Sequence, residues 1–414
     1  MKHKMFLLVL SLVILAIVLP VSAQDDGITV WITGSDTDAT TLQAAAAAFT
    51  EDTGVNVTVE AVSWDDAYSR YLTAVNSGTG ADVFAGGMSW GISLGGVGGL
   101  VDLSQQFPDE YQSVLDGTNP SFVEAIIGQD GAVYGVPYNQ DVLLMYYLPE
   151  NLAAVGYDAP PATWEEFSDL VTKLNDAGMG GAGMGWGNVS WLGFQPFLAQ
   201  AGGSWYTEDC SAAAVNSDAG VTALEYYTTL YEDLGFPQEA AAVSGFSTGD
   251  LSILFDGEWV APGIDTSYPE LVGKWAVAPM PVGPAGNNDT FIGGKMMGIF
   301  SFSPNVDSAW QFIQWLQTED AAQSLTVENY NNASLFVPPQ TANAGTIQGD
   351  PAVVAAIGTQ LENTSGPANC PGWEESNADV NLALQSVLFE GETFEEALAQ
   401  MEDVMNANLV EYGS

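Results

Sequence analysis

The chain has very few basic side chains and almost no histidine. Six of its 414 residues are Lys or Arg, against 52 Asp and Glu, and the single histidine is His3. Nucleic acid and anionic lipid attract positively charged surfaces, so neither is an expected partner. Because no imidazole follows residue 3, the rest of the chain has no histidine base, no histidine-dependent catalytic triad and no histidine metal site.

Cysteine is also scarce, since Cys210 and Cys370 are the only two. Two thiolates are too few for a zinc cluster, and the sequence indicates no metal site and no cofactor. In an oxidising compartment we expect the two cysteines to form one disulfide, with two buried thiols as the alternative. Thiol alkylation of the unreduced, denatured protein distinguishes these states.

Residues 1–23 have the pattern of a secretory signal peptide. Lys2 and Lys4 give a positive start, residues 6–19 form an apolar run, and residues 21–23 offer small side chains for cleavage. We therefore expect export to the periplasm or the cell exterior. No cysteine follows the cleavage site, so no lipid anchor is expected, and no later stretch has the length and apolarity of a membrane span.

The roughly 390 residues that remain are enough for two domains with separate cores. At the start of this region, strand patterns alternate with helix patterns over residues 27–34, 41–54, 55–62, 64–78 and 81–87. This order predicts a parallel sheet with right-handed crossovers. Ligands of such sheets bind beyond the carboxyl ends of the strands, which selects the loops at 34–36, 63–65 and 87–90. These loops contain Ser35, Asp36, Trp64, Ser89 and Trp90.

A second α/β region follows Pro137. A helix over residues 163–178 begins with Thr163 and Glu166 at capping-box spacing, and the last helix begins in the same way with Thr393 and Glu396. Residues 178–194, rich in glycine and tryptophan, are expected to form a loop. At residues 135–147, "GVPYNQDVLLMYY", a polar cluster stands directly before an apolar strand.

Several stretches together resemble the extracellular sugar-binding proteins of ABC importers, the family that includes maltose-binding protein. They are "GTGADVF", "YGVPYNQDVLLMYYLPENL", "PATWEEFSDLVTKL", "ILFDGEW", "VAPMPVGPAG", "FIGGKMMGIF", "SAWQFIQWLQTEDAAQ" and "GETFEEALAQ". Each pattern is loose, but their order and spacing make the set specific, and it covers most of the mature chain. The chain departs from the family in the missing anchor cysteine and the low number of Lys and Arg.

The resemblance implies two α/β lobes that close on a ligand by hinge bending, with the ligand cleft between them. Three segments would cross between the lobes, near residues 137–140, 293–294 and 315–318. The expected lobe one is 24–137 plus 294–317, and lobe two is 138–293 plus 318–414. The polar cluster at 139–141 would then face the cleft, and both cysteines would lie in lobe two.

A sugar offers apolar ring faces and hydroxyl edges, so its site needs flat aromatic rings and paired carboxylates or amides. The resemblance implies stacking by Trp259 and an acidic contact from Asp141. Asp256 and Glu258 flank this tryptophan, and either is expected as a ligand contact or only as a turn cap. Lys295 beside Gly294 is expected to pair with an acid more readily than with the ligand. The complete set of candidates is Ser35, Asp36, Trp64, Ser89, Trp90, Asn139, Asp141, Asn188, Trp191, Asp256, Trp259, Gly294, Lys295, Trp373 and Glu374.

The expected function is capture of a neutral sugar by an exported monomer that delivers it to an ABC permease and breaks no bond. With one arginine in the chain, an anionic ligand is disfavoured. One alternative is another solute, such as a polyol, a glycerophosphodiester or a polyamine. A second alternative, from a different class, is a glycoside hydrolase in which Asp256 or Glu258 faces Asp141 across an aromatic cleft.

Overall fold

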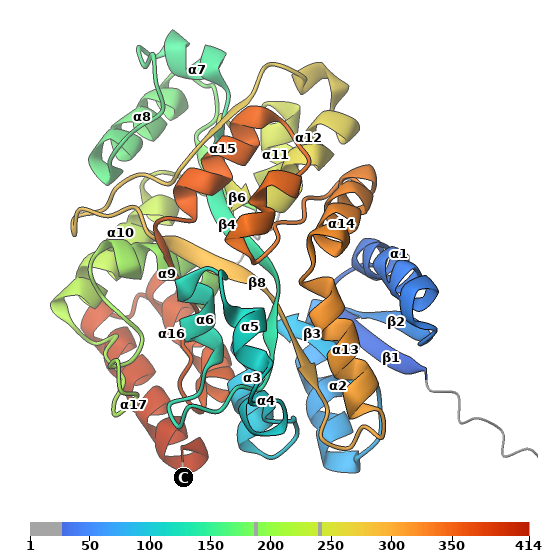
Figure 1. The fold of residues 1–414 in the computed structure, drawn as a ribbon. Helices are drawn as coiled ribbons and strands as arrows, with labels where there is room; N and C mark the ends of the chain where they lie inside the picture. Colours follow the sequence, from blue (N-terminus) through green and yellow to red (C-terminus); the bar gives the residue numbers. More distant parts are fainter. Residues whose placement is uncertain (1–26, 186–188, 239–241, 414) are drawn as a thin grey trace, which may run out of the picture.

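The computed structural model describes residues 27–185, 189–238 and 242–413 (Figure 1). The predicted signal segment 1–23 and the candidate Asn188 lie outside these residues. The chain folds into a mixed α/β structure in which helices surround a central sheet. No helix in the described ranges combines the length and the hydropathy that a membrane span requires.

The first part of the chain forms the predicted parallel sheet. Its elements are β1 (Ile28–Thr33), α1 (Asp36–Thr53), β2 (Val57–Val62), α2 (Trp64–Ser77) and β3 (Val83–Gly87). Strand β1 pairs in parallel with both β2 and β3. Both helices end at a glycine in the left-handed conformation, Gly54 and Gly78, as the sequence predicts. The loops that follow β1, β2 and β3 therefore meet at one edge of the sheet.

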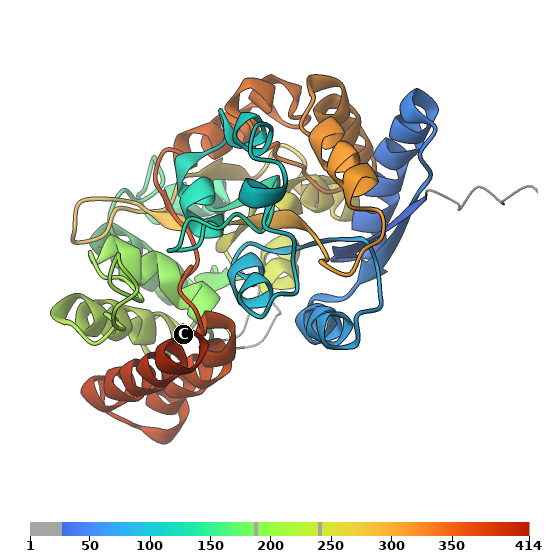
Figure 2. The ribbon, with the colours of Figure 1, turned by 60° about the horizontal axis from the view of Figure 1, so that its bottom comes forward.

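The remaining elements are, in chain order, α3 (Trp90–Gly96), α4 (Leu103–Gln106), α5 (Tyr111–Leu115), α6 (Pro120–Ile126), β4 (Val136–Tyr147), α7 (Pro149–Ala154), α8 (Trp164–Asp176), β5 (Ala182–Met184), α9 (Trp191–Gln200), α10 (Asp218–Glu232), α11 (Ala242–Thr248), β6 (Ile253–Gly257), the 3₁₀ helix η1 (Glu258–Val260), α12 (Ala261–Ser267), η2 (Pro269–Leu271), β7 (Ala276–Ala278), β8 (Thr290–Ile299), α13 (Val306–Leu316), α14 (Glu319–Asn331), η3 (Thr341–Thr346), α15 (Pro351–Gln360), β9 (Thr364–Ser365), α16 (Trp373–Glu390) and α17 (Phe394–Tyr412). Helices α16 and α17 pack side by side at the C-terminal end of the chain (Figure 2).

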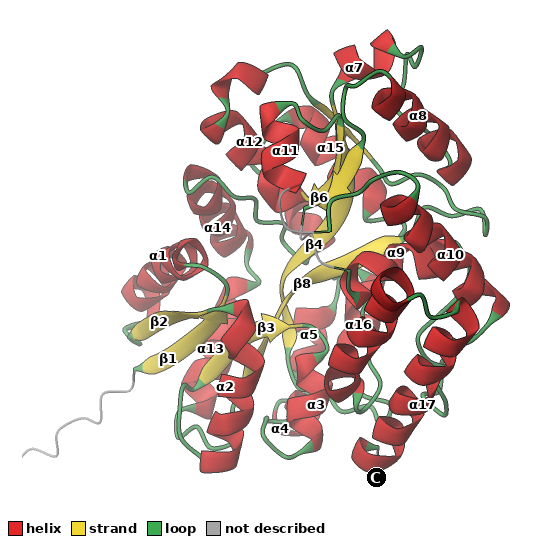
Figure 3. Cartoon of the chain, turned by 180° about the vertical axis from the view of Figure 1, so that it is seen from behind, coloured by secondary structure: helices red, strands yellow, loops and turns green. Residues whose placement is uncertain are grey.

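Two long strands connect the halves of the sheet. The strand order is β2-β1-β3-β8-β4-β6-β5, with β7 beside β4 and β9 beside β8. Strand β4 is antiparallel to β8 over residues 136–142 and to β6 over residues 143–147. Figure 3 shows β4 and β8 crossing the centre of the molecule between groups of helices. The polar cluster at 139–141 therefore lies on a strand shared by both halves.

The buried apolar side chains form three separate cores. The first surrounds β1 and β3 and includes Ile32 and Phe84. The second lies among α8, α9, α10, α16 and α17, and the third covers the apolar half of β4 around Leu144. The second and third cores lie beyond the crossing strands from the first. This division produces two lobes, because apolar surface is buried on either side of the crossing and polar side chains lie between.

The position of the third crossing, which the resemblance implies at 315–318, can be compared with the packing of the helix that follows it. Helix α14 packs against α1, and Leu325 and Phe336 belong to the first core. Leu335 and Val337 belong to the third core. Packing therefore favours a boundary of lobe one near residue 336, and the boundary at 317 stays a prediction from the sequence.

The loop predicted at 178–194 contains regular structure. Residues 182–184 form β5, which pairs in parallel with β6, and α9 begins at Trp191. The glycines that favour a loop in the sequence instead allow close packing, since a Cβ on Gly183 would meet Ala242 at 2.8 Å. Local composition was a poor guide here because pairing with β6 decides the conformation.

Candidate ligand-binding site

A cavity of about 660 Å³ lies where the polar parts of β4 and β8 meet the loops that follow β1 and β3. Its volume is in the range of small-molecule sites. The first lobe contributes side chains from the start of α1 and from the loop before α3, and the second contributes η1 and the first turns of α9 and α16. A molecule bound there would contact both lobes.

Two indole rings from the first lobe form one wall. Trp64 is 50% exposed, whereas Trp90 is 7% exposed. The Trp64 ring meets the Trp90 ring nearly edge to face, with centroids 5.6 Å apart. The Trp90 ring lies on the backbone of Gly86 and Gly87, where an added Cβ would come within 2.6 Å and 2.8 Å of it. Trp90 therefore supports the wall, and Trp64 is the more exposed of the two rings.

The facing wall carries Trp259 and Trp191. A Cβ on Gly257 would lie 2.0 Å from the Trp259 ring, so only glycine lets this ring fold back over the end of β6. The Trp191 ring packs edge to face on Phe291 and on Trp373, at centroid distances of 5.8 Å and 5.3 Å. Indole rings from both lobes thus line the same cavity.

The expected pairing of Lys295 with an acid is present. The Lys295 Nζ donates to Asp38 Oδ1 at 2.9 Å, and Asp38 Oδ2 accepts from the N–H and the Oγ of Ser35, both at 2.8 Å. Burial raises the pKa of Asp38, but Lys295 and Ser35 outweigh it and leave the pKa below its usual value. Burial lowers the pKa of Lys295, but Asp38 and then Asp141 leave it above its usual value. Both groups therefore stay charged, and the Lys295 ammonium is already paired with the Asp38 carboxylate.

Asp141 on the floor of the cavity has a buried glutamate behind it. Its Oδ1 accepts from Asn139 Nδ2 at 2.6 Å. Glu258 is fully buried, and its Oε2 accepts from the Val142 N–H at 2.9 Å. Burial, and then the charge of Asp141, raises the pKa of Glu258 well above its usual value. Burial also raises the pKa of Asp141, although Lys295 opposes this shift, so both carboxyl groups hold a proton more readily than a free acid does.

Glu374 reaches the cavity from the first turn of α16. It accepts hydrogen bonds from Ser89 Oγ and, at 3.1 Å, from Asn377 Nδ2. Burial raises the pKa of Glu374 to about 7, although Ser89 opposes the shift. The next residue, Glu375, accepts from the Tyr68 hydroxyl at 3.0 Å. The start of α16 is thus hydrogen-bonded to the first lobe.

The arrangement of the sheet, the crossing strands and the cavity can be compared with known proteins. Residues 33–323 match the family model described as "Bacterial extracellular solute-binding protein". The chain belongs to this family. Its members bind solutes outside the cytoplasm, so the location is periplasmic or extracellular, and the ligand is a small molecule that an ABC transporter imports.

Relatives of this solute-binding protein cover most of its length. A binding protein of Brucella abortus is 23% identical over 351 residues, which are 81% of this chain and 82% of the relative. Among solved structures, the sugar-binding protein MalE of Xanthomonas citri has a TM-score of 0.80 at 20% identity, over 93% of this chain and 98% of that one. A solute-binding protein of Thermotoga lettingae bound to α-D-tagatose has a TM-score of 0.79 at 23% identity, over 92% and 99%. These likenesses confirm the predicted two-lobe fold.

Most candidates from the sequence come together in this solute-binding protein. The cavity is lined by Ser35, Trp64, Ser89, Trp90, Asn139, Asp141, Trp191, Trp259, Gly294, Lys295 and Glu374. Five other tryptophans do not line it, namely Trp31, Trp164, Trp275, Trp310 and Trp315. Contact of each lining residue with a ligand stays a prediction.

Three candidates lie elsewhere. Asp36 is the first residue of α1 and is exposed, and Asp38 takes its place because the bonds from Ser35 turn that carboxylate back to the cavity. Asp256 is 3% exposed on β6, with a carboxylate that would overlap a Cβ on Gly185 and that accepts from the Gly257 N–H. Trp373 is 1% exposed and belongs to the second core.

Other cavity residues were missed by sequence reasoning. They are Asp38, Thr41, Tyr138, Leu192, Phe291, Asn329, Ser334, Leu335, Phe336, Pro367 and Asn377, whereas the lining residues Gly87 and Met88 lie in the selected loop 87–90. The spacing of Ser35 and Asp38, typical of a capped helix start, was a signal for Asp38. Asn329 and Phe336 had no such signal, because the packing of α14 on α1 brings them to the cavity.

We expect Asp256→Asn to stabilise the protein at pH 8 and to leave its stability nearly unchanged at pH 4. Burial raises the pKa of Asp256 to about 7, against an opposing hydrogen bond from the Gly257 N–H. The folded state therefore binds the proton more tightly than the unfolded state, and its stability falls as pH rises from about 4 to 7. Because asparagine does not titrate, Asp256→Asn should raise the free energy of unfolding by about 2–4 kcal/mol at pH 8. Urea unfolding measures this difference.

Asp209→Asn is the control with the opposite sign. This exposed carboxylate has its pKa lowered to about 2 by hydrogen bonds from Ser211 and Thr207. Its contribution is present above the unfolded pKa and is lost as pH falls toward 2. Asp209→Asn should therefore cost stability at neutral pH. Equal stability differences for Asp256→Asn at pH 4 and pH 8 would contradict the assignment of a raised pKa to Asp256.

Proposed function

We propose that this solute-binding protein captures a neutral carbohydrate between its lobes and delivers it to an ABC permease. The observation that carries the proposal is one cavity lined from both lobes by indole rings and by carboxylate and amide groups. Rings match the apolar faces of a sugar, and the acids and amides match its hydroxyls. The sugar-binding MalE and the tagatose-bound protein of the same fold are in keeping with this ligand class.

The charges in the cavity support an uncharged ligand. Among the described lining residues Lys295 is the one cation, and it is held by Asp38. Carboxylate or phosphate ligands need free cations or arginine forks. The cavity also holds the carboxyl groups of Asp38 and Asp141, to which a sugar hydroxyl can donate.

We infer that capture works by closure of two rigid bodies. The proposed bodies are the lobes predicted from the sequence, with α14 assigned to the first. A ligand that touches both walls favours the closed state, because these contacts exist together only when the lobes converge. Strands β4 and β8 pass between the lobes, so their polar residues meet the ligand while their backbone bends.

We propose binding without catalysis, by a monomer. Glycoside hydrolysis needs two carboxyl groups that flank the scissile bond. Asp256 does not line the cavity, and Glu258 is fully buried behind Asp141. Neither group can therefore face Asp141 across a sugar in this arrangement.

Thermal-shift measurements test the ligand class. The panel contains maltotriose, lactose, tagatose, erythritol, spermidine and glycerol 3-phosphate. A ligand at 100 times its Kd stabilises the folded state by about 2.7 kcal/mol, which is readily seen as a higher Tm. We expect a shift with at least one neutral sugar and none with glycerol 3-phosphate. A shift with spermidine alone would indicate that the ligand is a polyamine and not a carbohydrate. Release of reducing ends from an oligosaccharide would contradict binding without catalysis.

We expect Trp259→Ala to weaken binding of the sugar found in this panel by about 10- to 100-fold, since loss of a buried aromatic contact costs about 1–3 kcal/mol. Isothermal titration calorimetry measures the change. The matched control is Trp275→Ala, because Trp275 is partly buried in the same lobe but lies outside the cavity. Trp275→Ala should lower Tm and leave Kd unchanged. Equal affinities of Trp259→Ala and the wild type would show that Trp259 does not contact the ligand.

A further inference from the structure

The first turn of α16 connects the cavity to the opposite lobe. Glu374 lines the cavity and accepts from Ser89, and Glu375 accepts from the Tyr68 hydroxyl at 3.0 Å. Ser89 and Tyr68 belong to the first lobe. The position of this turn therefore decides whether Glu374 can face the cavity and the first lobe at once.

Trp373 holds the turn from the core side by packing. It is 1% exposed, and its ring lies 5.1 Å from the Trp205 ring and 5.3 Å from the Trp191 ring. Its Nε1 has no hydrogen-bond partner among the described residues, so shape alone fixes the side chain. Gly372 before it has φ of 77°, and a Cβ there would lie 2.6 Å from the Asn408 carbonyl oxygen. The helix start is thus pressed closely against α17.

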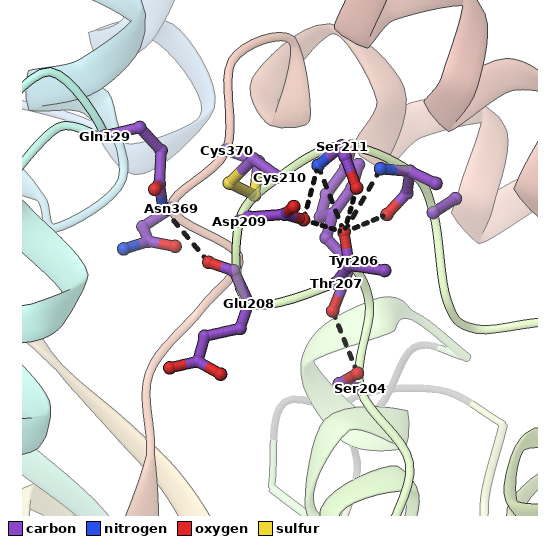
Figure 4. The surroundings of a disulfide bond; sticks show 12 residues. Gln129, Ser204, Tyr206, Thr207, Glu208, Asp209, Cys210, Ser211, Asn369 and Cys370 are labelled. Carbon is purple, nitrogen blue, oxygen red and sulfur yellow. Dashed lines mark hydrogen bonds between the residues drawn. A yellow bond between two sulfur atoms is a disulfide. The ribbon is translucent and has the colours of Figure 1, made fainter.

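A disulfide fixes the chain just before this turn. Cys370 is bonded to Cys210, with the two Cα atoms 5.5 Å apart (Figure 4). Cys210 lies in a tight turn in which its N–H donates to the Thr207 carbonyl at 2.9 Å. The turn is attached to α17, because the Ala213 N–H donates to Asn406 Oδ1 at 2.8 Å. The bridge therefore ties the segment before α16 to the second core.

Few hydrogen bonds anchor this segment to its own lobe, although Ala368 and Cys370 pack in the second core. Between β9 and α16, residues 366–371 make few hydrogen bonds to other parts of the described chain. The Trp373 N–H donates to the Cys370 carbonyl at 3.3 Å. Gln195 donates to the Gly366 carbonyl, and Asn369 Nδ2 donates to the Glu124 carbonyl at 2.6 Å. Glu124 belongs to α6, which packs in the first core. Without the bridge, the segment would keep its hydrogen bond to the first lobe at Asn369 and would be held to the second lobe only by packing and by the hydrogen bonds at its two ends.

We propose that the Cys210–Cys370 disulfide and Trp373 are positioning residues of the ligand site, which hold the first turn of α16 so that Glu374 faces both the cavity and Ser89. Their effect on ligand capture rests on the proposed function. Their effect on Glu374 does not, and it can be measured without any ligand. Loss of either would leave Glu374 more hydrated and less often bonded to Ser89.

The test follows the Glu374 carboxyl group in the unliganded protein. Glutamate is labelled with ¹³C at the side-chain carboxyl, and Glu374→Gln identifies the resonance. Burial sets the pKa of Glu374 to about 7 in the wild type. In C210S/C370S we expect the titration midpoint to fall by more than about one pH unit, because burial is the largest cause of the shift. Amide exchange at residues 373–377 should become at least about tenfold faster.

Controls separate positioning from general stability. Leu42→Ala removes a fully buried side chain of the first core, and it should lower Tm while leaving the Glu374 midpoint near its wild-type value. If C210S/C370S does not fold, the same two quantities are measured in two other samples. These are the folded wild type reduced with a phosphine and Trp373→Phe with the bridge intact. A midpoint and exchange rates that match the wild type in the reduced protein and in Trp373→Phe would overturn the proposal.

Discussion

Lys295→Met is expected to destabilise the protein by about 3–5 kcal/mol at neutral pH, since removal of one partner leaves a buried charge unpaired. Lys295 is 8% exposed, and its Nζ lies 2.9 Å from Asp38 Oδ1. Methionine keeps the length of the side chain, so the loss reports the charge and not a cavity. Chemical unfolding in urea measures the difference in the free energy of unfolding.

The pH dependence and a double variant identify the cause. Without the cation, the pKa of Asp38 should rise, so the folded state binds an extra proton and the cost of Lys295→Met should shrink as pH falls. Adding Asp38→Asn to Lys295→Met should recover part of the loss, because the remaining amide carbonyl can still accept from Ser35. The exposed pair of Arg70 and Glu60, at 3.1 Å, is the surface control, and Arg70→Met should cost less than about 1 kcal/mol. A similar small cost for Lys295→Met would contradict a buried ion pair.

Gly294→Ala is expected to cost about 2–4 kcal/mol, because the residue combines a positive φ with close backbone packing. Its φ is 121°, and an added Cβ would lie 2.1 Å from the Asn139 carbonyl oxygen. Gly294 pairs with Gln140 where β8 crosses β4. The clash is with backbone of the neighbouring strand, so relief requires the two crossing strands to separate.

Gly358→Ala is the matched control. This exposed glycine lies within α15, and an added Cβ would meet nothing within 4 Å. Alanine there should stabilise the protein by about 0.5–1 kcal/mol, because it lowers the entropy of the unfolded chain in a helix position. If Gly294→Ala also raised the Tm, this result would contradict the positive φ and the close backbone packing assigned to Gly294.

Much of the site was accessible from local patterns. The alternation of strands and helices over residues 27–87 fixed the parallel sheet, and the sheet in turn placed Ser35, Trp64 and Trp90 at one edge. Parallel pairing brings the carboxyl ends of strands together wherever the loops lead, so the prediction needed no loop geometry. The same rule could not choose between Asp36 and Asp38. That choice depended on which carboxylate the start of α1 turns toward the cavity.

The predictions failed where distant segments meet. Residues 178–194 read as a loop because glycine weakens both helix and strand patterns, yet β5 forms on the edge of β6. Trp373 was a candidate for stacking on the ligand because it is a tryptophan in a late loop pattern. Its ring instead fills the space between Trp191 and Trp205. A tryptophan satisfies a core and a sugar site equally well, so its neighbours in space decide its place.

The sequence by itself determined the sheet at the start of the chain, the capped helices, the scarcity of cations and the order of segments that marks the family. Each of these follows from side chains within one or two turns or strands of one another. Tertiary structure alone decided that Trp373 lies in a core, that α14 packs on α1 and that Lys295 is held by Asp38. Those outcomes depend on contacts between residues far apart in the chain, whose desolvation and packing energies exist only after the lobes have formed.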